Sequence, residues 1–212
     1  MKIALVMEWS TSQRNELVYE TLKKVAEANG HTVDNYGQFN PEDHRMTYNQ
    51  CAILTSVILN SGAADFVVTG CGTGEGAMLA ANSMPGVECG LVYDPSDSYL
   101  FTQINNGNAI SLPYAKGFGW GAEVNLEYIF EKLFVQEPGG GYPPHAAESE
   151  KNNKRILDGL KKVSHQDIKY ILANADKDLV KASFGGPKTM ELLEANCKDR
   201  TILDAVKAAI AD

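Results

Sequence analysis

A thiol, a hydroxyl and a carboxylate alternate with glycines in one short stretch of this sequence. They belong to Cys71, Thr73 and Glu75, within GCGTGEG at 70–76. Glycines leave backbone amides bare, and amides beside the start of a helix hold negatively charged oxygen. A thiol or a carboxylate in the same loop can move a proton. The stretch therefore predicts a cradle for a small anion that carries its own base.

Other uses of a glycine-rich loop do not fit this spacing. Gly72, Gly74 and Gly76 give GxGxG, whereas dinucleotide sites need GxGxxG, and no Gly-Lys-Ser/Thr follows as in a P-loop. A cysteine phosphatase needs an arginine soon after the thiol, and the next arginine is Arg155. Glu75 would also repel a bound pyrophosphate.

The loop lies between a predicted strand and a predicted helix. FVVT at 66–69 is apolar and β-branched, which is typical of a strand buried on both faces. The apolar spacing over 78–82 is helical. Ligands in open α/β sheets bind at the carboxyl ends of the strands, which is where this loop would lie.

Strand and helix patterns alternate along the first two thirds of the chain. Strands are expected at 2–7, 31–36, 66–69, 87–93 and 108–112, and the pattern at 31–36 suits a strand nearer an edge. Helices are expected from 10–12 to 29, at 48–59, from about 76, from 94, and at 118–134. This order predicts an α/β fold of three layers around a five-stranded parallel sheet.

The clearest boundary is PGGGYPP at 138–144. We predict a domain over 1–137, a Gly/Pro linker over 138–149, and a small helical C-terminal extension over 150–212. Helices in the extension are expected at 151–163, 164–173, 189–196 and 201–211, with a short segment around 178–182.

Composition restricts the partners and the compartment. The net charge of −8 argues against nucleic acid, no run approaches the length of a membrane span, and the first residues lack a signal-peptide pattern. Four irregularly spaced cysteines suit a reduced cytoplasm better than disulfides or a zinc site. Residues 1–150 hold 7 Lys and Arg against 18 Asp and Glu, a balance of −11, and 151–212 hold 12 against 9, or +3. The first region would bind an anion through backbone amides, or with the help of cations from the second region or another subunit.

Several motifs together resemble one enzyme family. CGTGEG at 71–76, AAN at 80–82, PGV at 85–87 and QINNGN at 103–108 are similar to the type B ribose-5-phosphate and galactose-6-phosphate isomerases. The likeness covers about 1–137 and a helix from near Lys151. It implies a Rossmann-like α/β/α subunit, and a homodimer or dimer of dimers that shares its active sites. It also implies aldose–ketose isomerisation of a sugar phosphate through an enediolate, with no metal and no cofactor.

The resemblance also assigns roles in the glycine loop. In most of the family the base is the cysteine at the position of Cys71, and in one branch a glutamate at the position of Glu75 serves instead. This sequence has both. We favour Cys71 as base, with Glu75 orienting a hydroxyl or sharing the proton; the alternative is that Cys71 is only a small buried residue. Amides of Gly72 to Gly76 would hold the enediolate oxygen, and Thr73 and Asn105 would orient hydroxyls.

Two departures from the family pattern concern the substrate. Glu8-Trp9 stands where the family has Asp-His, whose histidine helps to hold the phosphate. Trp9 could stack on a sugar or pack over the cleft. Ile104 stands where the family has its ring-opening histidine, so another group opens the ring, or the substrate arrives open-chain, or the reaction differs.

Other candidate residues lie late in the chain. Lys151 and Arg155 keep the spacing of two family arginines that reach a neighbouring subunit's phosphate, although i, i+4 charges also form solvated faces. Asn105 and Asn108 match family positions that line the site, although asparagine beside Gly107 also suits a turn. Two other functions stay open: an isomerase of another sugar or sugar acid, with or without a phosphate, and a non-catalytic sugar-phosphate sensor.

Overall fold

The computed structural model describes residues 1–211 and has a single five-stranded parallel sheet in that range. Its strands are β1 (Lys2–Leu5), β2 (Thr32–Asn35), β3 (Phe66–Cys71), β4 (Cys89–Leu91) and β5 (Ala109–Pro113). They lie in the order β2-β1-β3-β5-β4. The predicted parallel sheet is confirmed, and the second strand lies at an edge as expected. All six residues of the central strand β3 are buried.

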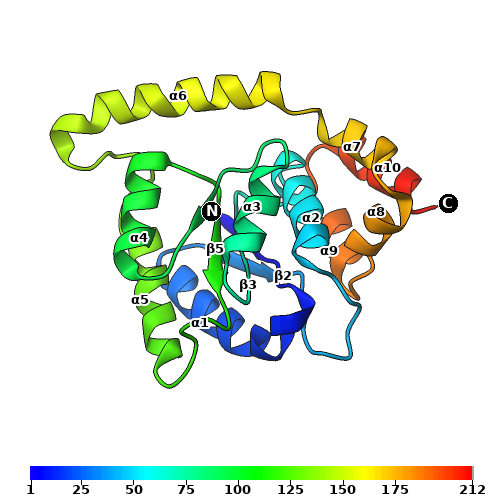
Figure 1. The fold of residues 1–212 in the computed structure, drawn as a ribbon, viewed down its shortest axis with the longest axis horizontal. Helices are drawn as coiled ribbons and strands as arrows, with labels where there is room; N and C mark the ends of the chain where they lie inside the picture. The colour runs from blue at the N-terminus through cyan, green and yellow to red at the C-terminus, as the bar shows by residue number, and fades with distance from the viewer. Residues whose placement is uncertain (212) are drawn as a thin grey trace.

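Helices cover both faces of the sheet, as predicted. On one face α1 (Asn15–Ala28) and α5 (Ala122–Phe134) pack together, and α4 (Pro95–Leu100) contacts α5. On the other face lie α2 (Tyr48–Asn60) and α3 (Glu75–Asn82) (Figure 1). A capping box between Thr47 and Gln50 begins α2.

Two helices within the first 137 residues begin later than the sequence pattern predicted. The chain first forms a 3₁₀ turn, η1 (Trp9–Arg14), and only then α1. The helix predicted from 118 begins at Ala122, after glycines with positive φ at 117 and 121. A π-helical turn, η2 (Phe101–Asn105), continues α4.

The C-terminal extension is helical, as predicted. It contains α6 (Ala147–Ser164), α7 (Ile168–Asn174), α8 (Lys177–Ser183), α9 (Thr189–Asn196) and α10 (Arg200–Ile210), preceded by a short 3₁₀ turn, η3 (Pro144–Ala146). Its last predicted residue, Asp212, lies outside the described residues. Helices α7 to α10 gather beside α2, and their apolar residues join the same buried cluster (Figure 1).

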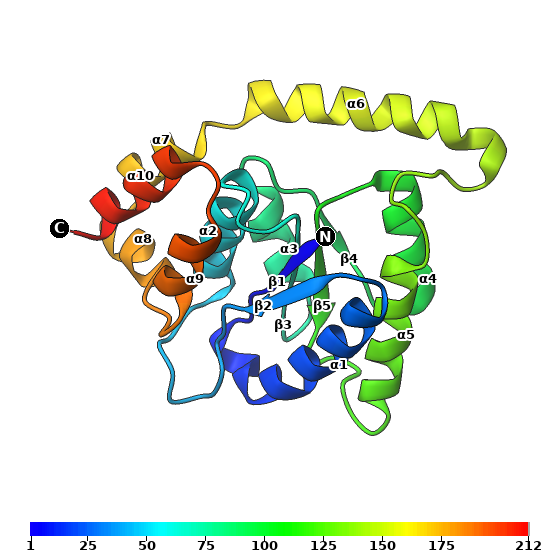
Figure 2. The same ribbon diagram turned by 180° about the vertical axis from the view of Figure 1, so that it is seen from behind.

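Helix α6 behaves differently from the other helices of the extension. It crosses the molecule on the side of the amino ends of the strands, which is also the side of the N-terminus, in both views (Figures 1 and 2). None of its 18 residues is buried. Among residues 1–211, no helix is long and apolar enough to cross a membrane.

Candidate active site

The glycine loop is held in place by the neighbouring strand β5 and its exit. Cys71, the last residue of β3, pairs with Pro113. The carbonyl of Gly72 accepts hydrogen bonds from the amides of Ala115 (3.0 Å) and Lys116 (2.8 Å). The buried Ser111 hydroxyl donates to the Gly74 carbonyl at 2.6 Å. The loop at 72–74 is therefore fixed before any ligand arrives.

Gly74 is a position in this loop where only glycine fits. Its φ is +79°, in the left-handed region that L side chains avoid. A Cβ there would lie 2.7 Å from Leu91 Cδ1 and 3.1 Å from the carbonyl carbon of Leu112. The backbone thus turns directly into α3, whose first amides lie at the carboxyl edge of the sheet.

The three predicted catalytic residues lie together around this turn. The Cys71 side chain is nearly buried, and its Sγ lies 4.0 Å from Thr73 Oγ1. Thr73 Oγ1 in turn accepts the Glu75 amide at 3.3 Å. Glu75 begins α3 and its side chain is 56% exposed. The thiol therefore lies at the base of the cradle and the carboxylate at its rim.

Two other ionisable groups near Cys71 are poor bases. Burial raises the pKa of the Cys51 thiol, and the Glu8 carboxylate adds to this rise. Burial likewise raises the pKa of the Tyr114 hydroxyl, which donates to the Thr69 carbonyl at 3.2 Å. Both groups stay protonated at neutral pH, so Cys71 and Glu75 remain the candidate proton carriers of this region.

Two residues outside the predicted site set contact Glu75: Tyr93, and Lys116, which the sequence marks only as a lone cation after the last predicted strand. The Tyr93 hydroxyl, just after β4, donates to Glu75 Oε1 at 3.1 Å. Lys116 Nζ, just after β5, lies 3.3 Å from the Tyr93 hydroxyl and 3.8 Å from Glu75 Oε1. No local motif marks these two residues, because only the sheet order brings the exits of β3, β5 and β4 side by side.

Glu8 and Trp9 leave β1 at the same edge of the sheet. Glu8 is buried and its carboxylate caps η1, accepting the Ser10 amide at 3.1 Å. Trp9 Nε1 donates to the Pro41 carbonyl at 3.0 Å, and the Arg45 guanidinium lies 4.3 Å from the indole ring centroid. This cation–π contact places a positive charge beside Trp9, where the family resemblance expects a phosphate-binding histidine. No local sequence pattern indicates this contact, since Arg45 lies in a distant loop.

The fourth glycine of the loop, Gly76, lies beneath an aromatic ring. A Cβ on Gly76 would approach the Tyr48 ring to 3.4–3.5 Å. Tyr48 begins α2 and is 41% exposed, so its ring forms part of the rim beside the start of α3.

The remaining predicted residues lie at the edge of the sheet formed by the amino ends of the strands, opposite to the edge where Cys71 lies. Asn108 precedes β5, five residues before Pro113, which is about 16 Å along a strand. Its side chain accepts the Glu88 amide and donates to the Gly86 carbonyl, both at 2.8 Å. Asn105 ends η2 on the same side. One chain by itself therefore does not bring these asparagines to Cys71, and their roles stay predictions.

Lys151 and Arg155 lie near the amino end of α6, also at this opposite edge. They line a small cavity together with Ile104, Asn106 and other residues. Both are exposed; Lys151 pairs with Glu148 at 3.4 Å, and Arg155 Nε donates to the Lys151 carbonyl at 3.4 Å. Their charges are thus available to a ligand or a neighbouring molecule.

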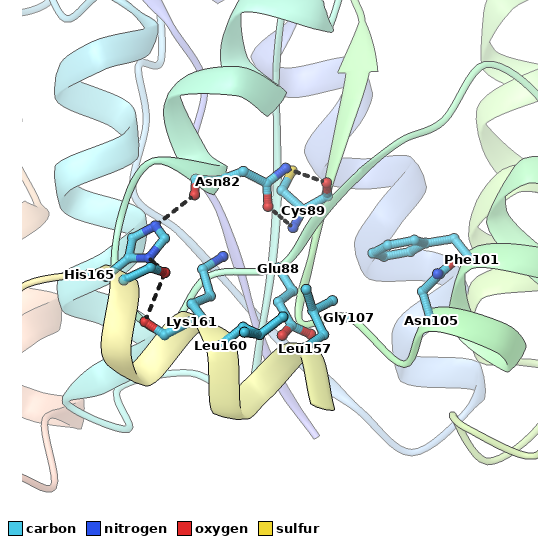
Figure 3. A pocket seen from close by; sticks show the side chains of 11 residues that line it. Asn82, Glu88, Cys89, Phe101, Asn105, Gly107, Leu157, Leu160, Lys161 and His165 are labelled. Carbon is cyan, nitrogen blue, oxygen red and sulfur yellow. Dashed lines mark hydrogen bonds between the residues drawn. The ribbon is translucent and has the colours of Figure 1, made fainter. Parts of the chain in front are cut away.

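A larger cavity of about 490 Å³ lies between α6 and the amino edge of the sheet (Figure 3). Asn105, Phe101 and Cys89 line it from the sheet side, and Leu157 and Leu160 from α6. Polar contacts hold α6 over it. Lys154 pairs with Glu88 at 2.8 Å, Lys161 Nζ donates to the Val87 carbonyl, and His165 Nε2 lies 3.2 Å from the Asn82 carbonyl. Burial lowers the pKa of Lys161 and raises that of Glu88, despite the Lys154 ammonium beside Glu88.

Comparison with known proteins identifies the family of this chain. Residues 3–137 match the family described as Ribose/Galactose Isomerase. The chain belongs to this family of sugar isomerases. The predicted resemblance and the predicted isomerase activity are thereby confirmed. A second family, described as Ribose-5-phosphate isomerase, matches residues 163–209. None of the curated proteins matches the chain.

Two solved structures match the isomerase over its whole length. One is described as 4-deoxy-L-threo-5-hexosulose-uronate ketol-isomerase complexed with a tartrate; it is 49% identical, with 100% of both chains covered and a TM-score of 0.97. The other is described as a ribose-5-phosphate isomerase from Vibrio parahaemolyticus; it is 46% identical, with 99% of both chains covered and a TM-score of 0.96. A ribose-5-phosphate isomerase from Thermotoga maritima is 26% identical, with 74% of this chain and 97% of its own covered and a TM-score of 0.57.

Proposed function

We propose that this isomerase interconverts the aldose and ketose forms of an open-chain sugar acid, a uronate without a phosphate. The observation that carries the proposal is Ile104, an aliphatic residue at the position where the family resemblance places a ring-opening histidine. The full-length likeness to a uronate ketol-isomerase supports it. The phosphate sugar expected from the family resemblance is the second candidate.

The chemistry of the relative's substrate name agrees with Ile104. A sugar aldehyde closes its ring through a hydroxyl on C4 or C5. A 4-deoxy-5-hexosulose has no hydroxyl on C4 and a ketone on C5, so neither ring can form. Such a substrate needs no acid or base to open it. An isomerase that acts on it can replace the ring-opening histidine with isoleucine.

The glycine loop can supply the remaining chemistry. The base removes the proton from C2, the C2–H electron pair forms the C1–C2 double bond, and the carbonyl oxygen on C1 becomes the enediolate oxygen. That oxygen would lie against the amides of Gly72 to Gly76. The protonated base then returns its proton to C1, and the proton of the C2 hydroxyl passes to the oxygen on C1, giving the ketose. We assign the base to Cys71, with Glu75 moving the hydroxyl protons.

An acid substrate requires a cation, and Arg45 and Lys116 both lie at the carboxyl edge of the sheet, one on each side of the loop. The Arg45 guanidinium is exposed and stacks on Trp9. A guanidinium binds a carboxylate with two parallel hydrogen bonds, which an ammonium cannot do. Arg45 is therefore our candidate for the substrate carboxylate.

We further propose that the enzyme is a homodimer whose sites use residues of both copies. Asn105, Lys151 and Arg155 lie at the sheet edge opposite Cys71, so only a second copy could bring them to its loop. Apolar side chains of α6 support this: Ile156 is 53%, Leu160 59% and Val163 83% exposed. A partner would remove that surface from water. Val163→Glu should then yield a monomer in sedimentation, and a wild-type monomer would refute the proposal. Four buried free cysteines fit the predicted cytoplasmic location.

Proton exchange at C2 in heavy water tests the function directly. Three substrates are compared: the 4-deoxy-5-hexosulose-uronate, ribose 5-phosphate and galactose 6-phosphate. Each is tested with the wild type, Cys71→Ala and Glu75→Gln. We expect exchange on the uronate, abolished in Cys71→Ala and slowed in Glu75→Gln. Faster exchange on a phosphate would favour the second candidate, which Lys151, Arg155 and the Vibrio relative support. Binding without exchange on any sugar would favour a sensor.

A further inference from the structure

Glu75 is an exposed residue held in one orientation. A half-exposed glutamate ordinarily samples several rotamers, and fixing it has an entropic cost. Here Oε1 accepts the Tyr93 hydroxyl at 3.1 Å, and Lys116 Nζ lies 3.8 Å away from the same oxygen. Tyr93 and Lys116, which we call the bridging residues, both contact Oε1 of Glu75. Oε2 is therefore the Glu75 oxygen that can exchange a proton.

The backbones of the two bridging residues are themselves fixed. The Lys116 amide donates to the Gly72 carbonyl at 2.8 Å, which joins the exit of β5 to the glycine loop. The Tyr93 amide donates to Asp97 Oδ2 at 2.9 Å, and Asn125 Nδ2 donates to the Tyr93 carbonyl at 3.2 Å. The Lys116 ammonium also lies 4.8 Å from the Tyr93 ring centroid. Both side chains are thus positioned from elements other than the one that carries Glu75.

The Tyr93 hydroxyl has two acceptors within reach but only one proton. Glu75 Oε1 is 3.1 Å away and the Thr73 carbonyl 3.3 Å, while Lys116 donates to the hydroxyl oxygen at 3.3 Å. While Glu75 is a carboxylate, the hydroxyl donates to it. When Glu75 takes up a proton, the hydroxyl can turn to the Thr73 carbonyl. The arrangement therefore accommodates both protonation states of Glu75 without moving the loop.

Resting on the isomerase function proposed above, we propose that Tyr93 and Lys116 are positioning residues that orient Glu75 for proton transfer. Neither needs to touch the substrate. The Tyr93 hydroxyl, followed by the Glu75 carboxylate, raises the pKa of Lys116, so its ammonium keeps its charge at neutral pH.

Kinetics of single and double variants test this role. We expect Tyr93→Phe to lower kcat about tenfold with KM changed less than about twofold, because one hydrogen bond to a charged group is lost from the transition state. Lys116→Met should lower kcat about fivefold, and Lys116→Arg should restore most of it. In a Glu75→Gln background, Tyr93→Phe should cause little further loss, because both changes break one interaction. Tyr128→Phe and Lys132→Met, on the exposed surface of α5, are the matched controls.

A titration of the Lys116 ammonium tests its contacts with Tyr93 and Glu75 without any substrate. In ¹³C-methylated protein, the Lys116 signal should titrate at lower pH in Tyr93→Phe and in Glu75→Gln than in wild type. Unchanged titration, wild-type kcat in Tyr93→Phe, or independent losses in the double variant would each overturn the positioning role. These results differ from a failure of the proposed function, in which wild type exchanges no proton on the uronate. If wild type acts on a sugar phosphate instead, the same kinetic cycle is measured on that sugar.

Discussion

Replacing Gly74 by alanine tests whether the shape of the loop depends on the absence of a side chain. Gly74 has φ +79°, and its added methyl would lie 2.7 Å from Leu91 Cδ1 and 3.1 Å from the carbonyl carbon of Leu112. The left-handed backbone alone costs about 1–2 kcal/mol. The contact with a neighbouring backbone adds about 1–3 kcal/mol, because β5 cannot yield without breaking its pairing with β3.

Gly30 provides the matched control. It has φ +75°, and no heavy atom lies within 4 Å of the position of an added Cβ. Gly30→Ala therefore carries the backbone strain without the clash. The difference between the two variants should be about 2 kcal/mol, or about 6 °C in melting temperature for a chain of this size.

Urea unfolding measures the expected loss of stability, and C2 proton exchange measures the expected loss of activity. Gly74→Ala should unfold at lower urea than Gly30→Ala, and its exchange rate should fall at least about a hundredfold, because displaced amides no longer face the enediolate oxygen. Gly30→Ala should exchange at the wild-type rate. Equal stability and equal activity in the two variants would refute the account of this loop.

Three further predictions concern other charged groups. Asp94 caps α4, and hydrogen bonds, first from a serine hydroxyl and then from a backbone amide, hold its pKa below the usual range. Asp94→Ala should therefore lower the unfolding free energy by about 1 kcal/mol near neutral pH, and this difference should disappear as the pH falls below 3.8. A cap that still stabilises at pH 2 would contradict this. Arg45→Met removes the guanidinium stacked on the indole and should raise KM for the uronate about fivefold, but not for a neutral sugar; an equal rise for both would exclude carboxylate binding. Lys154→Met leaves the Glu88 side chain, only 13% exposed, without its cation, and should lower the unfolding free energy by about 1–2 kcal/mol in urea; an unchanged midpoint would show that the ion pair contributes nothing.

The local signals that predicted the fold are strong ones. FVVT at 66–69 is too apolar and β-branched for anything but a buried strand, and four glycines in seven residues cannot continue it. In the extension, Asp167 and Asp199 cap α7 and α10; α10 begins within one residue of its predicted start, whereas α7 begins four residues after its own. The observed helix starts differ from the predicted ones where the chain first forms 3₁₀ or irregular turns, as before α1 and α5. Side-chain periodicity continues through such turns, so the sequence pattern does not mark where the α-helix begins.

The candidate site could be predicted only where its residues are close in the sequence. Cys71, Thr73 and Glu75 share one loop, so their spacing alone suffices to predict proton-transfer chemistry there. Tyr93, Lys116 and Arg45 reach the same edge from three separate loops, and each by itself looks like an ordinary surface residue.

The sequence by itself determined the parallel α/β architecture, the glycine loop and its candidate proton carriers, because strand, turn and helix preferences act over a few residues. The tertiary structure alone decided which loops meet. The order β2-β1-β3-β5-β4 brings Tyr93 and Lys116 to Glu75, and it places Asn105 and α6 at the opposite edge. That order depends on which apolar faces pack together across the whole chain, and no short stretch of sequence records it.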